Sequence, residues 1–143
     1  MRLEIRDGLL VMQVRLAYHG RVLTVDNMIV DTGAVHTLID SAAVEDLSLS
    51  TDEDDIIVTM AGIGGNDYAV RKTIDGLIFG SYTMVHPSLD FGNLGAHPGI
   101  NGLLGLDILL HGRFVLDLSA LTVEPTSANR NKKATDPNAP SGR

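Results

Sequence analysis

Short stretches of apolar or alternating residues, separated by glycines and other turn residues, run along most of this chain and predict β-strands. Residues 8–18 alternate loosely between apolar and polar side chains, and residues 21–25 continue after a His-Gly turn. These two stretches predict a hairpin that leads into the apolar residues 28–30. Further expected strands, separated by turn signals, cover residues 37–39, 56–59, 68–71, 74–79, 82–85, 114–118 and 121–123.

Short helices are expected between some of the strands. Asp40 or Ser41 is placed to cap a helix over residues 42–47, because a short polar side chain accepts a hydrogen bond from the free N–H groups of a first turn. A second helix of little more than one turn is expected over residues 107–111. Residues 86–101 are rich in proline, glycine and asparagine and are expected to form a loop. The pattern predicts an all-β fold, a closed or partly open β-barrel with one or two short helices.

The length and composition indicate one globular domain. A chain of 143 residues with 44% hydrophobic residues is long enough to bury a core. We expect the domain to cover residues 1–125, because residues 126–143 carry almost no apolar side chains and are expected to be a disordered polar tail. The chain contains no cysteine, which excludes disulfides and thiolate chemistry.

The charge pattern argues against nucleic-acid and membrane partners. The formal net charge is −7, and the expected core carries no basic patch that could neutralise phosphates. The acidic run at residues 52–55 is expected to be a solvated loop. Residues 1–7 carry mixed charges unlike a signal peptide, and no apolar run approaches the roughly 20 residues that span a bilayer. We therefore expect a soluble cytoplasmic protein.

The most informative motif is Asp31-Thr32-Gly33-Ala34, which follows the apolar residues 28–30. Three apolar residues in a row are typical of a strand that is covered on both faces. The glycine permits a sharp turn or a close backbone approach, and the threonine places a hydroxyl close to the carboxylate. Burial and a neighbouring like charge would shift the pKa of such an aspartate and suit it to catalysis. The motif alone is a weak signal, because the same tripeptide occurs in ordinary turns.

Two further segments give the motif a context. Residues 60–65 are glycine-rich and lie between two expected strands, and residues 102–110 combine an apolar-apolar-glycine element with a short helix. In this order, the three segments resemble the retropepsin-like aspartic proteases, the single-domain relatives of pepsin. The resemblance covers roughly residues 8–124 and implies a barrel of the pepsin half-domain type. Besides the Asp31 turn, the matching positions are a flap tip at Gly62, Ile63, Gly64 and Gly65, and the element Leu103, Leu104 and Gly105.

The resemblance implies an aspartic endopeptidase that works as a homodimer. Peptide hydrolysis needs a water activated as nucleophile and a proton delivered to the leaving amine, which two carboxylates sharing one proton can supply. The chain contains a single Asp-Thr-Gly, since none of Asp75, Asp90 and Asp117 is followed by a hydroxyl residue and then a glycine. A second copy related by a two-fold axis would bring its own Asp31 beside the first. The expected partners are therefore a second copy and a peptide or protein substrate.

The resemblance also assigns roles to the neighbouring residues. Thr32 would tie the two catalytic loops together through its hydroxyl, although a local turn hydrogen bond is an equal alternative. Ala34 is small and would leave room for the substrate backbone. The glycine-rich tip at residues 62–65 would form a mobile flap that closes over an extended peptide. Residues 103–105 would pack beneath the Asp31 turn. This role differs little from that of an ordinary buried strand.

The chain departs from the viral members of the family at two positions. Val35 and Leu106 stand where the viral enzymes carry an acid and an arginine that bridge across the dimer, so the dimer must be held differently. His36 follows closely enough to line a substrate pocket or to be a polar group at a strand end. The five histidines show no metal-ligand spacing, and no metal or other cofactor is expected. The alternatives are a non-catalytic peptide-binding or dimerisation module on the same fold and a monomeric structural β-barrel.

Overall fold

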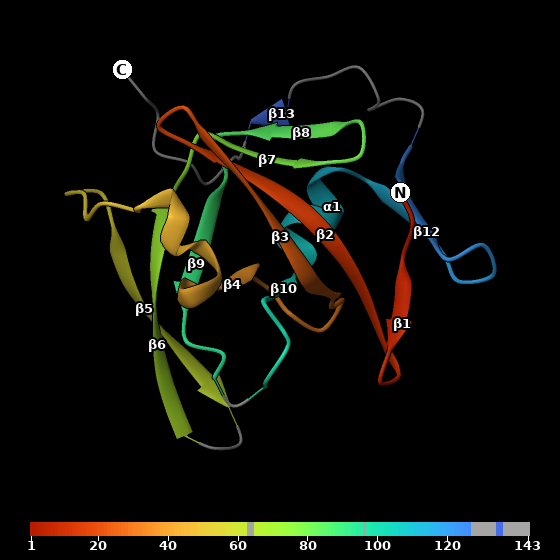
Figure 1. Ribbon diagram of the computed structural model, residues 1–143, viewed down its shortest axis with the longest axis horizontal. Coiled ribbons are helices and arrows are strands. Elements are labelled where there is room, and N and C mark those ends of the chain that lie inside the picture. The colour runs from red at the N-terminus through yellow and green to blue at the C-terminus, as the bar shows by residue number, and fades with distance from the viewer. Residues whose placement is uncertain (63–64, 96, 127–133, 136–143) are drawn as a thin grey trace.

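The computed structural model describes residues 1–62, 65–95, 97–126 and 134–135. A long antiparallel hairpin of β2 (Leu9–Tyr18) and β3 (Arg21–Val30) lies at the centre of the fold (Figure 1). From Val14 onward the buried and exposed side chains of β2 alternate, as the sequence pattern predicts. The hairpin therefore presents one face to the core and carries the chain toward Asp31.

The remaining elements form one large sheet, one small sheet and two short helices. Eleven strands belong to the large sheet, in the order β13-β8-β7-β2-β3-β10-β4-β9-β6-β5 with β1 beside β2, and β11 and β12 form a separate pair. The described part of the chain is thus mostly β with a sheet that does not close, which confirms the predicted all-β, partly open barrel. The other strands are β1 (Glu4–Arg6), β4 (Leu38–Asp40), β5 (Ile56–Gly62), β6 (Gly65–Thr73), β7 (Gly76–Phe79), β8 (Tyr82–Val85), β9 (Ser88–Gly92), β10 (Gly102–Leu104), β11 (Phe114–Asp117), β12 (Thr122–Pro125) and β13 (Ala134–Thr135).

Both predicted helices are present. The 3-10 helix η1 (Ser41–Leu47) is capped by Asp40, whose carboxylate accepts a hydrogen bond from the Ala42 N–H at 3.3 Å. The helix α1 (Leu106–His111) begins directly after β10. None of the described helices has the length and hydropathy needed to cross a membrane.

A contiguous core lies between the central hairpin, the β7–β8 hairpin and the two helices. Its fully buried side chains include Leu16, Met28, Leu77 and Leu104. Phe79, Tyr82 and Phe114 form an aromatic cluster in which ring centroids lie 4.6 to 5.4 Å apart. These contacts fix β10 and α1, which support the candidate site, against the rest of the barrel.

The expected loop at residues 86–101 contains a strand, so that part of the prediction is wrong. β9 lies between β4 and β6, parallel to the first and antiparallel to the second. Arg71 on β6 binds the nearly buried carboxylate of Asp90 on β9 through two hydrogen bonds of 2.7 and 3.1 Å. Of the predicted polar tail, residues 134–135 form β13 beside β8, and residues 127–133 and 136–143 lie outside the described residues.

Candidate active site

Asp31 stands at the point where β3 ends. Residues 28–30 of β3 pair in parallel with residues 102–104 of β10, and the Asp31 N–H donates to the Leu104 carbonyl at 3.0 Å. Met28 is fully buried, whereas Ile29, Val30 and Asp31 are only partly buried in the single chain. The strand is therefore less covered near Asp31 than the apolar run predicts. Among the described residues, no cation pairs with the Asp31 carboxylate.

The Asp31 turn is closed by its own hydrogen bonds. The Gly33 N–H donates to Asp31 Oδ1 at 2.9 Å, and the Ala34 N–H donates to the Asp31 carbonyl at 3.2 Å. A Cβ atom at residue 33 would lie 3.1 Å from Asp31 Oδ1, so a side chain there would press on the carboxylate. Thr32 and Gly33 are exposed and Ala34 is partly buried. The turn therefore holds one carboxylate in place and leaves an open surface beside it.

The element at residues 103–105 lies directly against this turn. The Leu106 N–H donates to the Ala34 carbonyl at 2.8 Å, and the Asp107 N–H donates to the Val35 carbonyl at 3.2 Å. A Cβ atom at Gly105 would lie 2.8 Å from the Ala34 carbonyl oxygen, so only glycine allows this approach. The beginning of α1 and the Asp31 turn thus form one hydrogen-bonded unit.

Two residues of this unit were missed by the sequence analysis as parts of the site. The side chain of Thr37 is fully buried and donates to Asp107 Oδ1 at 2.7 Å. Its hydroxyl also accepts from the Gly105 N–H at 3.0 Å, and its own N–H donates to Asp107 Oδ2 at 2.9 Å. Because 70 residues separate Thr37 from Asp107, no local pattern indicates this contact. The only local signal is an aspartate in the first turn of a helix.

The neighbouring predicted residues are on the surface. Val35 is 68% exposed and His36 is exposed, so both lie open beside the turn. Leu106 is partly buried at the beginning of α1. The surface next to the Asp31 turn is thus apolar where the viral enzymes of the resemblance carry charges. In the described residues, no group of three or more His, Cys, Asp or Glu side chains is placed to hold a metal ion.

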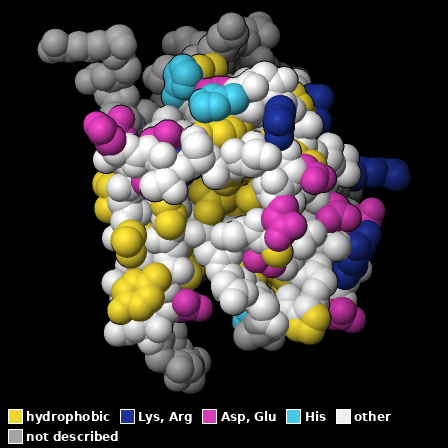
Figure 2. All heavy atoms as spheres, turned by 60° about the vertical axis from the view of Figure 1, so that its left-hand side comes forward, with side chains coloured by type: hydrophobic (Ala, Val, Ile, Leu, Met, Phe, Trp, Pro, Cys, Tyr) yellow, Lys and Arg dark blue, Asp and Glu magenta, His cyan; other side chains and the backbone are white. Residues whose placement is uncertain are grey.

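The predicted flap is a hairpin of β5 and β6. Its strands pair from Ile56 opposite Arg71 to Gly62 opposite Gly65, while Ile63 and Gly64 lie outside the described residues. Figure 2 shows the side of the molecule that faces left in Figure 1, with hydrophobic side chains at its surface. The exposed hydrophobic side chains of this hairpin are Ile56, Ile57, Tyr68 and Val70.

The base of this hairpin is bound by part of the acidic run at residues 52–55. Lys72 on β6 is 3% exposed, and its ammonium binds the Asp55 carboxylate at 2.8 and 3.0 Å and the Asp52 carboxylate as well. The hydrogen bond from Lys72 lowers the pKa of Asp52. The expectation of a wholly solvated acidic loop is therefore wrong for Asp55, whose side chain is 10% exposed, whereas Asp52 binds Lys72 and stays half-exposed. A buried lysine requires such partners.

The comparisons with known proteins agree with this geometry. A family model described as aspartyl protease matches residues 14–108. The crystal structure of a retropepsin-like aspartic protease from Rickettsia conorii is similar, with a TM-score of 0.62 and 19% sequence identity over 85% of this chain and 86% of that chain. No curated protein matches the chain. The matched segment contains the Asp31 turn, β10 and most of the first turn of α1, and the chain belongs to the aspartyl protease family with a retropepsin-like fold.

Proposed function

We propose that this protein is an aspartic endopeptidase whose active site is completed by a second copy of the chain. The observation that carries the proposal is a fully built Asp31 turn that supplies only one carboxylate. The three other aspartates considered from the sequence have different partners. Asp90 binds Arg71, Asp75 accepts from the His19 N–H, and Asp117 caps the turn after β11.

The chemistry needs a second carboxylate close to the first. The ionised partner takes a proton from the attacking water, and the protonated partner donates a hydrogen bond to the scissile carbonyl. Two carboxylates at this distance cannot both stay ionised, so the pair holds one proton and titrates in two macroscopic steps. The tetrahedral intermediate then collapses when a carboxyl proton reaches the leaving amine.

The surface around Asp31 supports a two-fold arrangement. In an isologous interface, residues at the axis meet their own counterparts, so an exposed turn that carries Asp31 is the expected position for the axis. Thr32, Gly33 and Val35 are exposed in the single chain and would be covered by the second copy. Apolar contact at Val35 replaces the charged bridge of the viral enzymes.

The β5–β6 hairpin is the proposed flap. It forms one end of the large sheet as two long paired strands (Figure 1), and its tip carries the glycine-rich residues 62–65. An extended peptide held between the flap and the paired Asp31 turns would have its backbone bound on both sides. We therefore expect substrates to be peptides or unfolded protein segments rather than small amides.

A subunit-mixing experiment tests the proposal. Asp31→Asn preserves the shape of the side chain and removes its charge, and the pure variant should lose at least about 100-fold in peptide cleavage while unfolding at the same temperature as the parent. Added in excess to the parent, it should also lower the parent's activity, because mixed dimers hold a single working carboxylate. Asp7→Asn makes the same charge change on an exposed turn. Added to the parent in the same excess, it should raise the total activity, because its dimers keep both Asp31 carboxylates. Full cleavage by folded Asp31→Asn protein would exclude the aspartic mechanism.

A further inference from the structure

One edge of β2 has a gap in its strand pairing. Val11 is the partner of Ile29 on β3 and of Glu4 on β1, so β1 lies on the edge of β2 opposite β3. Arg15 is likewise the partner of both Thr24 on β3 and Ile78 on β7. On that edge, β1 covers residues 9–11 and β7 covers residues 15–17, and no described strand covers residues 12–14.

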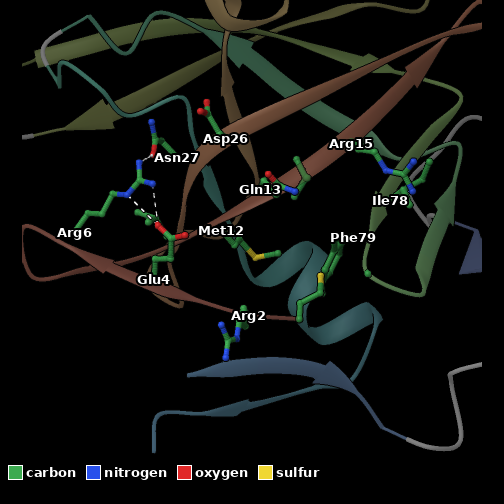
Figure 3. A pocket seen from close by; sticks show the side chains of 14 residues that line it. Arg2, Glu4, Arg6, Met12, Gln13, Arg15, Asp26, Asn27, Ile78 and Phe79 are labelled. Carbon is green, nitrogen blue, oxygen red and sulfur yellow. Dashed lines mark hydrogen bonds and ion pairs between the residues drawn. The ribbon is translucent and has the colours of Figure 1, made fainter. Parts of the chain in front are cut away.

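A groove of about 430 Å³ lies at this gap. Figure 3 shows its lining, with Met12 and Gln13 of β2 between the N-terminal segment and the end of β7. Met12 and Phe79 are nearly buried and form an apolar floor, whereas the Gln13 amide is exposed. On the other edge of β2, its partner β3 has a bulge at the same place, because the two residues Asp26 and Asn27 lie opposite Gln13 alone.

Three arginines surround this groove in a chain of net charge −7. Arg6 donates to Glu4 at 2.8 and 3.2 Å and also to the Asn27 side chain. Asp26 accepts from the Asn101 amide at 2.8 Å, so both carboxylates of the groove have partners. Arg2 and Arg15 are exposed and have no side-chain partner among the described residues. In Figure 3 they lie on opposite sides of Met12 and Gln13.

Of the other described lysine and arginine side chains, all but the exposed Arg113 have partners. Arg21 donates to the Asp46 carbonyl and the Ser48 hydroxyl, Arg71 binds Asp90, and Lys72 binds two aspartates. Arg2 and Arg15 therefore bring two unpaired guanidinium groups to one groove, whereas Arg113 does not line it. A planar guanidinium binds a carboxylate through two parallel hydrogen bonds, which suits it to acidic side chains.

We propose that this groove binds a short extended peptide segment with acidic side chains, at a site separate from the Asp31 turn. The open edge of β2 at residues 12–14 offers strand pairing to the peptide backbone, as sheet edges do when they recruit peptides. Arg2 and Arg15 take one carboxylate each, and Met12 and Phe79 contact an apolar side chain between them. Asp31 does not line the groove, so the proposal does not depend on hydrolysis.

A free anion would use only part of this site. Phosphate or a small dicarboxylate can pair with one arginine, but it cannot use the sheet edge and the apolar floor together. Residues two apart on a strand lie on one face about 7 Å from each other. A Glu-Thr-Val-Thr-Glu peptide therefore presents two carboxylates with a valine between them on one side of an extended backbone, and Gln-Thr-Val-Thr-Gln has the same shape without charge.

Binding of fluorescein-labelled Glu-Thr-Val-Thr-Glu, measured by fluorescence anisotropy, tests the proposal. All proteins carry Asp31→Asn so that the probe stays intact. Arg2→Gln and Arg15→Gln should each weaken binding about fivefold and together roughly 20-fold, as expected for partly exposed ion pairs. Arg113→Gln removes the same charge from an exposed turn elsewhere and should leave binding within about twofold of the parent. NMR shifts of the Gln13 and Asn27 side-chain amides should report binding at the groove itself.

The proposal is overturned if the glutamine peptide binds as tightly as the glutamate peptide, or if Arg113→Gln weakens binding as much as the groove variants do. Equal displacement of the probe by inorganic phosphate or glutarate at the same concentration would also overturn it, because the groove would then recognise an anion alone. Since the arginines are exposed, thermal unfolding of the variants should match the parent, and a binding loss without unfolding assigns the effect to the groove.

Discussion

The buried Thr37 hydroxyl should control both the stability of the fold and the activity of the site. Thr37→Val keeps the size and branching of the side chain but removes the donor to Asp107 and the acceptor for the Gly105 N–H. Thr37 and Gly105 are buried, so the Gly105 N–H loses its partner without gaining water, whereas the partly buried Asp107 Oδ1 keeps only the hydrogen bond from the Ile108 N–H. One bond involves a carboxylate and one is neutral, so the loss should be roughly 2–4 kcal/mol.

The same change should loosen the Asp31 turn. Gly105 contacts the Ala34 carbonyl, and the beginning of α1 holds the turn through its N–H groups. A displacement of even 1 Å at a catalytic group can cost about 100-fold in rate. Thermal unfolding and peptide cleavage measured on the same samples give both effects.

Two matched variants separate the hydroxyl from other causes. Thr37→Ser keeps the hydroxyl and should recover most of the stability and the activity. Thr24→Val makes the same substitution at an exposed position of β3 and should leave both unchanged. A Thr37→Val protein that unfolds at the parent's temperature and cleaves at the parent's rate would refute the reasoning, as would a Thr37→Ser protein as damaged as the valine variant.

Three further outcomes are expected. Specific activity should fall on dilution below the dimer's dissociation constant, because active sites track dimers, and a constant value across that range would rule out half-sites. Cleavage should be fastest at acidic to mildly acidic pH, where the paired carboxylates hold one proton, and a rate that still rises above neutral pH would point to another base. Burial raises the pKa of Tyr82 from its ordinary 10.0 to about 12, so the stability that depends on its neutral phenol is complete below pH 10 and is lost as pH rises through 12. Urea unfolding at several alkaline pH values should therefore show a shallower loss of stability for Tyr82→Phe than for the parent, and equal slopes would contradict the assignment.

Local signals in the sequence were sufficient for much of the fold. The alternation of β2, the Asp40 cap of η1 and the sharp turn after Asp31 each depend on neighbouring residues, and the structure has all three. β9 was missed because it is stabilised by pairing with β4 and β6, while its own residues include a glycine and an aspartate. That aspartate, Asp90, fits a strand only because Arg71 binds it.

The candidate site was predictable in its motif but not in its support. Asp31 and Gly105 belong to short recognisable motifs, whereas Thr37 and Asp107 meet only through the folded chain. The acidic run was misinterpreted at Asp55 for the same reason, since Lys72 lies 17 positions from that carboxylate in the sequence. The role of the glycine-rich tip stays a prediction, because Ile63 and Gly64 lie outside the described residues.

The parallel pairing of β3 with β10 has a consequence for the order of events during protein synthesis. The Asp31 turn is hydrogen-bonded to the backbone of Leu104, Leu106 and Asp107. These three residues leave the ribosome long after Asp31 itself. Contacts between such distant segments form late, because a long stretch of chain must first be closed into a loop. A partly synthesised chain therefore carries its aspartate on an unsupported turn. On the proposed function, the chain would gain peptidase activity only after β10 and the beginning of α1 are in place.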